Sequence, residues 1–559
     1  MTSLSSLPLE IVDQICEYVG DVRNLALVGK QCYTLTVKHR FRRISITRKK
    51  IGNSTLSAEV KRWSDILEAA SAFTIVRELS IFEWTTDIEE CGEIEYPNFQ
   101  TYADKLTRKD QLYTPIFSKL FDFKPRYEPE ETWTSLMLLL RQLSGLQDLV
   151  WACESQFPPS LLQILHEQLP RCSLHIRAFK MPSLHQDADH PVDIDQRDYS
   201  LATSPNLCSI LVPISHYDTF GCVEYNEEAA MEMAAGLAPN LKELHLVYGA
   251  LGSSLEYVRA LERGRSPWRG FFPLKAENDP KSQQPIRLQT LSISPATMQH
   301  FTPWEARLDF SALETLQLWD VQAETLMALS THSGSLAMLK TLALHTESPE
   351  DRISQEYSAD KAARLDDAAT WFLSALGLGR VRLERVHLSG GPHLGKSFRQ
   401  LLFSHGRSLR TLSLIAPARY AESGPRITVS RIKEIQTHCP HIQDLRLSLR
   451  RTHGNADEVA VYDALGKTTR LTCLTLQFHL LDQNPDSTSH SDSESPALAI
   501  EHDPEPSGET LISAAVDTPL ARAIFTRIVK AGARSLQTLK ILHADKLPPR
   551  HTPRLQVRV

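Results

Sequence analysis

The residues Leu409-Arg-Thr-Leu412-Ser-Leu414 show the pattern that decides the fold, L-x-x-L-x-L. Leu412 and Leu414 alternate with period two, which is typical of a short strand whose two leucines face the same way. Leu409 is expected to pack from the turn that leads into the strand. Clear copies of the pattern begin at Leu241, Leu288, Leu313, Leu339, Leu383, Ile442, Leu471 and Leu536, and weaker copies lie around Val76, Leu146 and Leu174.

Helical stretches separate the copies. They cover residues 227–237, 323–329, 368–376, 397–403, 432–437 and 520–530. One strand and one helix cannot bury their apolar faces alone, but neighbours stacked side by side can. The register resembles that of leucine-rich repeats, which implies an α/β fold. We therefore expect an irregular leucine-rich-repeat solenoid, with parallel strands on the concave face and helices on the convex face.

The spacing between copies is irregular. Steps of 25 and 26 residues join Leu288, Leu313 and Leu339, whereas longer steps follow Leu241, Leu339 and Leu471. The longer steps indicate either insertions or degenerate repeats. We expect inserted loops near residues 85–132, 263–287 and 345–365. Residues 482–510 contain no Lys or Arg and few apolar side chains, so a disordered acidic loop is predicted there.

The N-terminal segment has a different pattern. Ser6-Leu7-Pro8-Leu9-Glu10-Ile11-Val12 precedes Ile15 and Val19, and Asp21-Val22-Arg23-Asn24-Leu25-Ala26-Leu27-Val28 precedes Lys30 and Tyr33. Pro8 and Glu10 suit the first turn of a helix. Ile11, Ile15 and Val19 form one apolar stripe on that helix. This order of residues resembles the F-box over residues 4–46. The resemblance therefore implies an N-terminal helical F-box module, 1–46, followed by an irregular leucine-rich-repeat domain, 47–559.

The combination of an F-box with leucine-rich repeats implies a role in protein degradation. In that family the F-box binds a Skp-type adaptor, which bridges to cullin and RING subunits, and the repeats hold the target protein. The resemblance implies a substrate-recognition subunit of an SCF-type ubiquitin ligase, which is not itself an enzyme and needs no cofactor. The implied adaptor-binding residues occupy apolar F-box positions: Leu7, Pro8, Ile11, Ile15, Leu25 and Val28. The alternative is an interaction scaffold whose F-box assembles no ligase.

The strand pattern also suggests where a target would bind. The x position between the last two leucines of each copy points away from the leucines, toward the inner wall. Candidate target-binding residues at this position are Gln317, His387, Ser413, Arg446 and Thr475. The competing interpretation is that each is an ordinary solvated polar residue that binds no target. We expect His245, His345 and His387 to be solvated histidines on the rims of separate repeats.

One segment matches a phosphate-binding motif. Residues 390–397, from Gly390 through Gly395 and Lys396 to Ser397, fit G-x-x-x-x-G-K-[ST]. In a nucleotide site Lys396 would reach the phosphates and Ser397 would hold Mg²⁺. However, Leu383, Val386 and Leu388 just before it are in register with the other repeats, so glycines are needed there for the strand-to-helix turn. Nucleotide binding is therefore the less favoured alternative.

Composition limits the remaining classes. The net charge of −6 argues against general nucleic-acid binding. The nine cysteines are scattered without a C-x-x-C pair, and His438-Cys439-Pro440-His441 supplies too few ligands for a zinc site, so no metal is expected. Without a secretory leader pattern, we expect reduced thiols in a cytoplasmic or nuclear protein. No apolar run approaches the length of a membrane span, so neither nucleic acid nor membrane is an expected partner.

Overall fold

The copies of L-x-x-L-x-L form strands in the computed structural model. The structure describes Cys16 and residues 30–49, 56–84, 127–153, 155–186, 193–217, 221–249, 265–271, 285–346, 359–389, 395–415, 427–452, 454–479, 517–543 and 555–558. The chain divides into unit 1, comprising Met1–Ile293 with Pro303–Asp309, and unit 2, comprising Ser294–Thr302 with Phe310–Val559.

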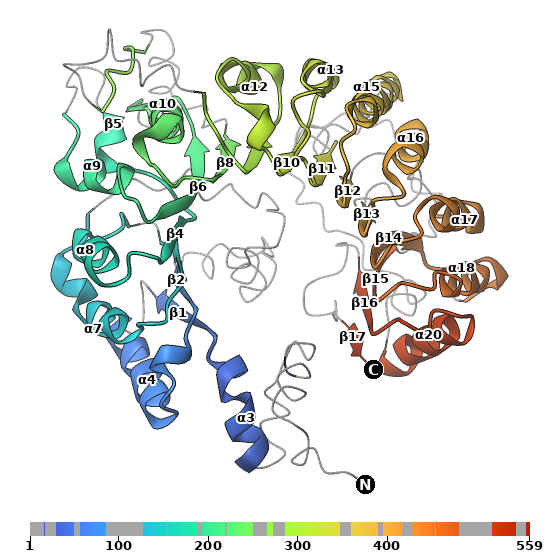
Figure 1. The fold of residues 1–559 in the computed structure, drawn as a ribbon, viewed down its shortest axis with the longest axis horizontal. Helices are drawn as coiled ribbons and strands as arrows, with labels where there is room; N and C mark the ends of the chain where they lie inside the picture. Colours follow the sequence, from blue (N-terminus) through green and yellow to red (C-terminus); the bar gives the residue numbers. More distant parts are fainter. Residues whose placement is uncertain are drawn as a thin grey trace, which may run out of the picture. The chain divides into compact units, whose positions relative to one another are not determined.

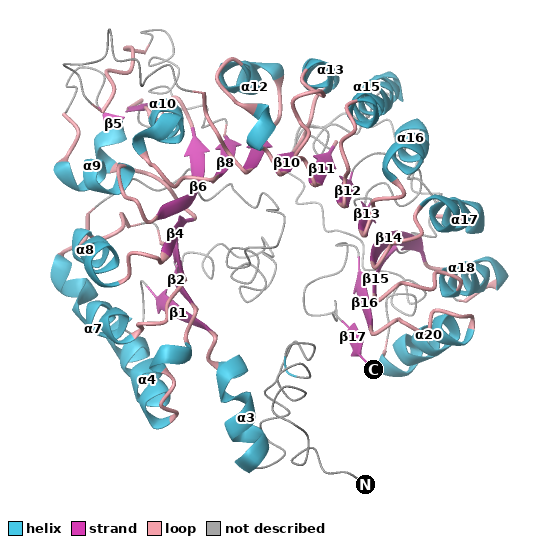
Figure 2. Cartoon of the chain, viewed as in Figure 1, coloured by secondary structure: helices cyan, strands magenta, loops and turns pink. Residues whose placement is uncertain are grey.

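Unit 1 alternates strands of one sheet with helices that cover one side of it (Figures 1 and 2). The sheet strands, in the order in which they lie side by side, are β1 (Arg43–Lys49), β2 (Glu78–Trp84), β3 (Asp148–Ala152), β4 (Ser173–Ile176), β6 (Leu207–Ile214), β8 (Glu243–Tyr248) and β9 (Thr290–Ser294). Strands β1 to β8 pair in parallel, with a bulge between β4 and β6. A separate antiparallel pair consists of β5 (His185–Gln186) and β7 (Val223–Glu224).

The helices of this part of the chain are α3 (Lys30–Arg40), α4 (Leu56–Ala69), α7 (Thr134–Gln142), α8 (Pro159–Gln168), α9 (Gln196–Ala202) and α10 (Asn226–Glu232). Shorter 3₁₀ turns are η2 (Phe73–Ile75), η4 (Glu130–Trp133) and η5 (Pro182–Leu184), and α10 continues into a π-helical turn, η6 (Met233–Leu237). Between β9 and the first strand of unit 2 lie α12 (Met298–Glu305) and η8 (Phe310–Ala312).

Unit 2 repeats the same strand-then-helix order. Its strands are β10 (Thr315–Leu318), β11 (Thr341–His345), β12 (Arg385–Ser389), β13 (Thr411–Ile415), β14 (Asp444–Arg450), β15 (Cys473–His479), β16 (Thr538–His543) and β17 (Leu555–Arg558). Its helices are α13 (Ala323–Thr331), α15 (Ala359–Leu378), α16 (Gly395–His405), α17 (Val429–His438), α18 (Ala456–Gly466) and α20 (Thr518–Lys530). Strands β10 to β16 are parallel, whereas β17 runs antiparallel to its neighbour.

The sheet register places the predicted leucines opposite one another. Leu412 of β13 lies beside Val386 of β12 and Leu445 of β14, and the second leucine of each copy is aligned in the same way. Leu412, Val386 and Leu445 are buried, like Leu409 in the preceding turn, whereas Leu414 is half-buried. The α/β class, the strand positions and the predicted helical stretches of the sequence are thus confirmed, and the architecture is solenoid-like.

A recurring backbone contact shows that the repeats are structurally equivalent. The carbonyl oxygen of Glu384 accepts hydrogen bonds from the N–H groups of Arg410 and Thr411, and that of Arg410 accepts them from Gln443 and Asp444. The same paired contact recurs in unit 1, where the carbonyl oxygen of Arg42 accepts from two consecutive N–H groups. Strands β11 to β16 therefore all start by the same connection to the previous repeat.

The long steps between copies are insertions. Strand β11 pairs directly with β12, and β15 pairs directly with β16, so no degenerate strand lies between them in the sheet. The insertion predicted over 345–365 is shorter than expected, because residues 359–365 belong to α15. The helical turn η4 likewise occupies the end of the segment predicted as a loop at 85–132. Residues 85–126, 272–284 and the whole acidic segment 482–510 lie outside the described residues.

Two strands of unit 1 were missed by the sequence pattern. In β1 the residues Phe41-Arg-Arg-Ile44-Ser-Ile46, and in β6 the residues Leu207-Cys-Ser-Ile210-Leu-Val212, keep the spacing but replace leucines by other apolar side chains. Strand β1 pairs with β2 from Arg43 onward. The sheet therefore begins inside the segment assigned to the F-box, so the predicted boundary at residue 46 lies within a strand.

Candidate functional site

The face of unit 2 opposite its leucine core is the main candidate surface. In β12, Val386 and Leu388 are buried in the core, so Arg385, His387 and Ser389 point to the other side of the sheet. The same alternation holds in the neighbouring strands. We call this surface, over β12 to β16, the strand face.

The five predicted target-binding residues lie in one row across unit 2. The register aligns Gln317, Ala343, His387, Ser413, Arg446, Thr475 and Lys540. Their exposure differs from the expectation, because Gln317, Ser413 and Thr475 are buried. Arg446, whose side chain is 41% exposed, is the most accessible of the five. The structure groups these residues on one surface, and their role in binding stays a prediction.

The prediction of solvated rim histidines is wrong. His245 is fully buried, and burial, followed by the nearby Arg177 and His175, lowers its pKa well below the usual value. His345 is half-buried, and its Nδ1 lies 3.3 Å from Asp320 Oδ1. Burial, together with Arg446 and Arg385, lowers the pKa of His387 to about 3. All three sit against folded structure, because neighbouring strands bring long side chains over them.

Three charged residues of the strand face were not singled out in the sequence. Arg385 and Asp444 lie in the row next to the one already described, aligned through Thr411, and Lys540 extends the first row onto β16. The sequence could have indicated them, because the alternation that places Arg446 on the strand face also places the residues two positions earlier in each strand on it. The first row alone was therefore an incomplete description of the surface.

The cations of this face have few partners. Arg385 Nε donates to Thr341 Oγ1 at 2.9 Å, and Arg446 Nη2 donates to Asp444 Oδ2 at 3.1 Å. Lys540 has neither a side-chain hydrogen bond nor an ion pair within the described part of the chain. After burial, which is the largest cause, the charges of Arg446 and Arg385 further lower the pKa of His387.

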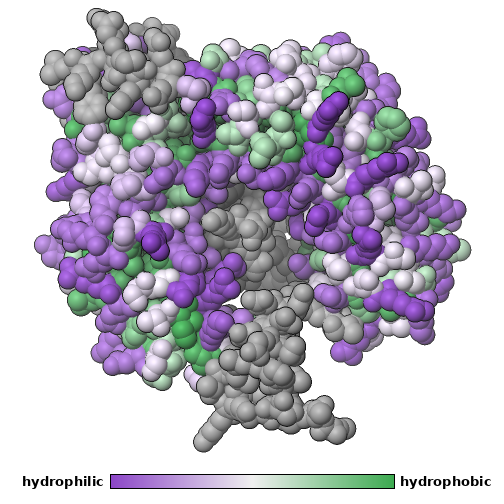
Figure 3. Space-filling model, in the orientation of Figure 1, coloured by the Kyte–Doolittle hydropathy of each residue, from purple (hydrophilic) through white to green (hydrophobic). Residues whose placement is uncertain are grey.

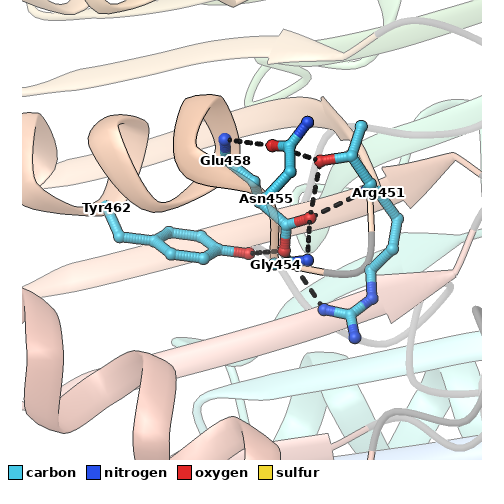
Figure 4. Close-up of polar contacts among 6 residues, drawn as sticks. Arg451, Gly454, Asn455, Glu458 and Tyr462 are labelled. Atoms are coloured by element: carbon cyan, nitrogen blue, oxygen red, sulfur yellow. Dashed lines mark hydrogen bonds and ion pairs between the residues drawn. The ribbon is translucent and has the colours of Figure 1, made fainter.

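A buried carboxylate fixes the turn that follows β14 (Figure 4). Glu458 of α18 accepts hydrogen bonds from the N–H groups of Thr452 and Gly454, from Tyr462 Oη and from Arg451 Nη1. Burial alone would raise the pKa of Glu458, but these donors together lower it. Asn455 caps the helix by accepting from the Glu458 N–H at 2.9 Å. The network holds the end of β14, and with it one side of the strand face.

The segment that matches the phosphate-binding motif is bound by carboxylates of the same chain. Asp366 of α15 accepts hydrogen bonds from the N–H groups of Lys396 and Ser397 at 3.1 Å each and from Ser397 Oγ at 2.6 Å. Lys396 Nζ contacts Asp367 Oδ1 at 2.7 Å, and Ser397 is buried. The groups that would hold phosphate and Mg²⁺ are thus bound to carboxylates, while Gly395 begins α16 and Gly390 lies outside the described residues.

Unit 1 contains buried polar pairs of its own. His175 Nε2 lies 3.0 Å from Asp148 Oδ1, and Arg177 Nη1 donates to Ser209 Oγ at 2.6 Å. Elsewhere Lys180 Nζ lies 3.4 Å from Glu224, a carboxylate that also accepts from Ser215 Oγ. Burial would raise the pKa of Glu224, but His185, Lys180 and Ser215 lower it. These pairs compensate buried charges, and their donors and acceptors are directed at one another.

Metal and membrane sites receive no support from the part of the chain that the structure describes. There, no group of three or more His, Cys, Asp or Glu side chains is arranged to hold a metal ion. Burial raises the pKa of Cys439 to about 12, and His441 Nδ1 contacts Arg470. Across the same residues, every helix is too short or too polar to span a bilayer.

The predicted adaptor-binding residues Leu7, Pro8, Ile11, Ile15, Leu25 and Val28 lie outside the described residues. What is described next to them is α3, on which Tyr33 is exposed and stacks with Arg40 at 5.0 Å. The chain matches no protein-family model and no curated protein.

Proposed function

We propose that this chain is the substrate-recognition subunit of an SCF-type ubiquitin ligase. Its N-terminal F-box-like segment would dock to a Skp-type adaptor, and its strand face would bind the target protein. The observation that favours a receptor is the strand face itself. Repeated strands at a spacing of about 4.8 Å present a continuous surface about 20 Å wide across β12 to β16.

Such a surface suits a protein partner. Its accessible side chains include Arg385 and Arg446, and arginine is enriched in protein interfaces. The buried polar side chains of the row, such as Ser413 and Thr475, fill the surface between them.

In this proposal the chemistry belongs to the partner subunits. The chain brings a target protein close to a conjugating enzyme that carries ubiquitin. An encounter between separate molecules thereby becomes one at high effective concentration. The N-terminal segment supplies one binding site and the strand face supplies the other. Neither requires a cofactor.

The direct test is adaptor co-purification with Leu7→Ala and Pro8→Ala combined. We expect the tagged variant to lose the Skp-type adaptor, because both residues match apolar F-box positions. The control combines Leu138→Ala with Leu378→Ala, two exposed leucines on α7 and α15. Circular dichroism should show both variants folded. Adaptor binding that survives in the first variant would remove the F-box assignment.

A scaffold that binds the adaptor without forming a ligase is the alternative. The same purification should contain cullin if a ligase assembles and lack cullin if it does not. With the proteasome inhibited, a ligase receptor should also retain a ubiquitinated protein. Adaptor without cullin or ubiquitinated protein would favour the scaffold.

A further inference from the structure

The strand face combines a positive charge with unfilled hydrogen-bonding capacity. Arg385, Arg446 and Lys540 lie on it, and Asp444 is the only carboxylate among the described face residues of β12 to β16. The whole chain has a net charge of −6, so this cluster opposes the overall balance. In Figure 3 the visible surface of unit 2 is mainly hydrophilic, with hydrophobic residues in small patches.

The three cations retain donors for a ligand. Arg385 uses Nε to reach a threonine hydroxyl, which leaves both of its terminal nitrogens. Arg446 meets one carboxylate oxygen, and Lys540 meets none within the described residues. Positive side chains near Cys473 include both Lys540 and Arg446. A carboxylate placed here would accept hydrogen bonds from charged donors, which are stronger than those between neutral groups.

The cations lie on every second strand in two neighbouring rows, because Arg446 is aligned with Lys540 whereas Arg385 is aligned with Asp444. They occupy alternate strands, with Arg385 on β12, Arg446 on β14 and Lys540 on β16. Alternate strands lie about 10 Å apart. A peptide in the extended polyproline II conformation advances about 3.1 Å per residue with three residues per turn, so every third side chain points the same way. A peptide lying across the strands would therefore bring every third residue near the next cation.

We propose that the strand face binds an extended acidic segment of a protein, with Asp or Glu at about every third residue contacting Arg385, Arg446 and Lys540. The inference deepens the proposed function and rests on it for the role of that protein as a ubiquitination target. Electrostatic complementarity of this kind raises the association rate and selects the partner.

The test measures binding of a fluorescein-labelled peptide that repeats Glu-Ser-Gly to the full-length chain by fluorescence anisotropy at low salt. A Gln-Ser-Gly peptide removes the charge, and a peptide of equal composition with its glutamates adjacent removes the spacing. Labelled oligothymidylate of equal charge tests for general polyanion binding. We expect the regularly spaced acidic peptide to bind most tightly.

The variant replaces all three cations, Arg385→Gln, Arg446→Gln and Lys540→Gln. Each exposed charge pair contributes a factor of about 2 to 5, so the dissociation constant should rise on the order of ten- to hundredfold. The matched control removes three exposed cations from the helical side of unit 2: Arg399→Gln, Arg407→Gln and Lys433→Gln. Its dissociation constant should change less than about twofold.

Three results would overturn the inference: equal weakening by both triple variants, oligothymidylate binding as tight as that of the spaced peptide, or no peptide binding at about 1 mM. Circular dichroism confirms that each variant is folded. Adaptor co-purification is measured on the same proteins. If a variant loses peptide binding but still binds the adaptor, the substitutions affect the strand face alone. If the wild type binds the peptide but never binds the adaptor, the ligase role is wrong and peptide recognition stands without it.

Discussion

Replacing Glu458 by glutamine tests whether buried charge holds the turn between β14 and α18. The substitution keeps the shape of the side chain and removes one acceptor. Glu458 Oε1 accepts from Arg451 and Tyr462, and Oε2 accepts from the N–H groups of Thr452 and Gly454. The amide nitrogen of glutamine must replace one of these oxygens. In one orientation the amide nitrogen faces the N–H groups of Thr452 and Gly454, and in the other it faces Arg451, while the Tyr462 hydroxyl can rotate to accept.

The loss can be estimated from these contacts. A buried donor without an acceptor costs about 1–3 kcal/mol. Arg451 is also left without its carboxylate while its side chain is only 8% exposed, and breaking a buried ion pair costs about 3–5 kcal/mol. These costs overlap, since Arg451 belongs to both. We expect Glu458→Gln to lower the free energy of unfolding of unit 2 by about 3 kcal/mol.

Urea unfolding followed by circular dichroism measures this loss, and hydrogen exchange at the Gly454 amide locates it. The control is Asp457→Asn, which removes a charge from the exposed neighbouring position in the same first helical turn. That variant should lose no more than about 1 kcal/mol. If Glu458→Gln costs no more than the control, the network does not hold the turn and the reasoning from buried charge is wrong.

Three further outcomes are expected. Leu412→Ala should cost about 2–5 kcal/mol in urea unfolding and Leu378→Ala less than about 0.5, because the first is fully buried and the second is 84% exposed; equal losses would contradict the assigned core. Because the pKa of His387 is about 3 in the folded protein, against 6.5 for an unperturbed histidine, the folded state binds fewer protons between these values and loses stability as pH falls through them. Urea unfolding at pH 7 and pH 5 should therefore show a loss smaller by up to about 2 kcal/mol in His387→Gln, and an unchanged loss would refute the assignment. Calorimetric titration with ATP should give no heat of binding for either the wild type or Lys396→Ala, since Asp366 occupies the motif, and saturable binding to the wild type alone would reverse this conclusion.

The repeat fold is largely predictable because one local pattern recurs. Leucines such as Leu342 and Leu412 must face one core, and the alternation of a strand fixes which residues lie beside them on the other side. A pattern that requires leucine does not predict the strands in which another apolar residue takes its place. Ile44 and Ile210 occupy the same structural position in β1 and β6, and the core accepts them because it selects apolar volume.

Exposure on the strand face could not be predicted from the sequence. Ser413 lies between His387 and Arg446 in its row, and Thr475 lies between Arg446 and Lys540. A short side chain between long ones about 4.8 Å away loses its contact with water. Those neighbours are distant in sequence, so burial here depends on a register that the folded sheet determines.

The distribution of carboxylates in unit 2 decides where an acidic ligand can bind. Helix N-termini are natural anion sites, but here the chain supplies their acceptors. Asp366 occupies the start of α16, and side-chain oxygens of Thr428, Asn455 and Asp517 accept from the first turns of α17, α18 and α20. These helices therefore have fewer free donors for an external carboxylate. The strand face differs because, among its described residues, guanidinium and ammonium groups exceed carboxylates, so the acidic segment that we propose would be recognised by residues between the recurring leucines.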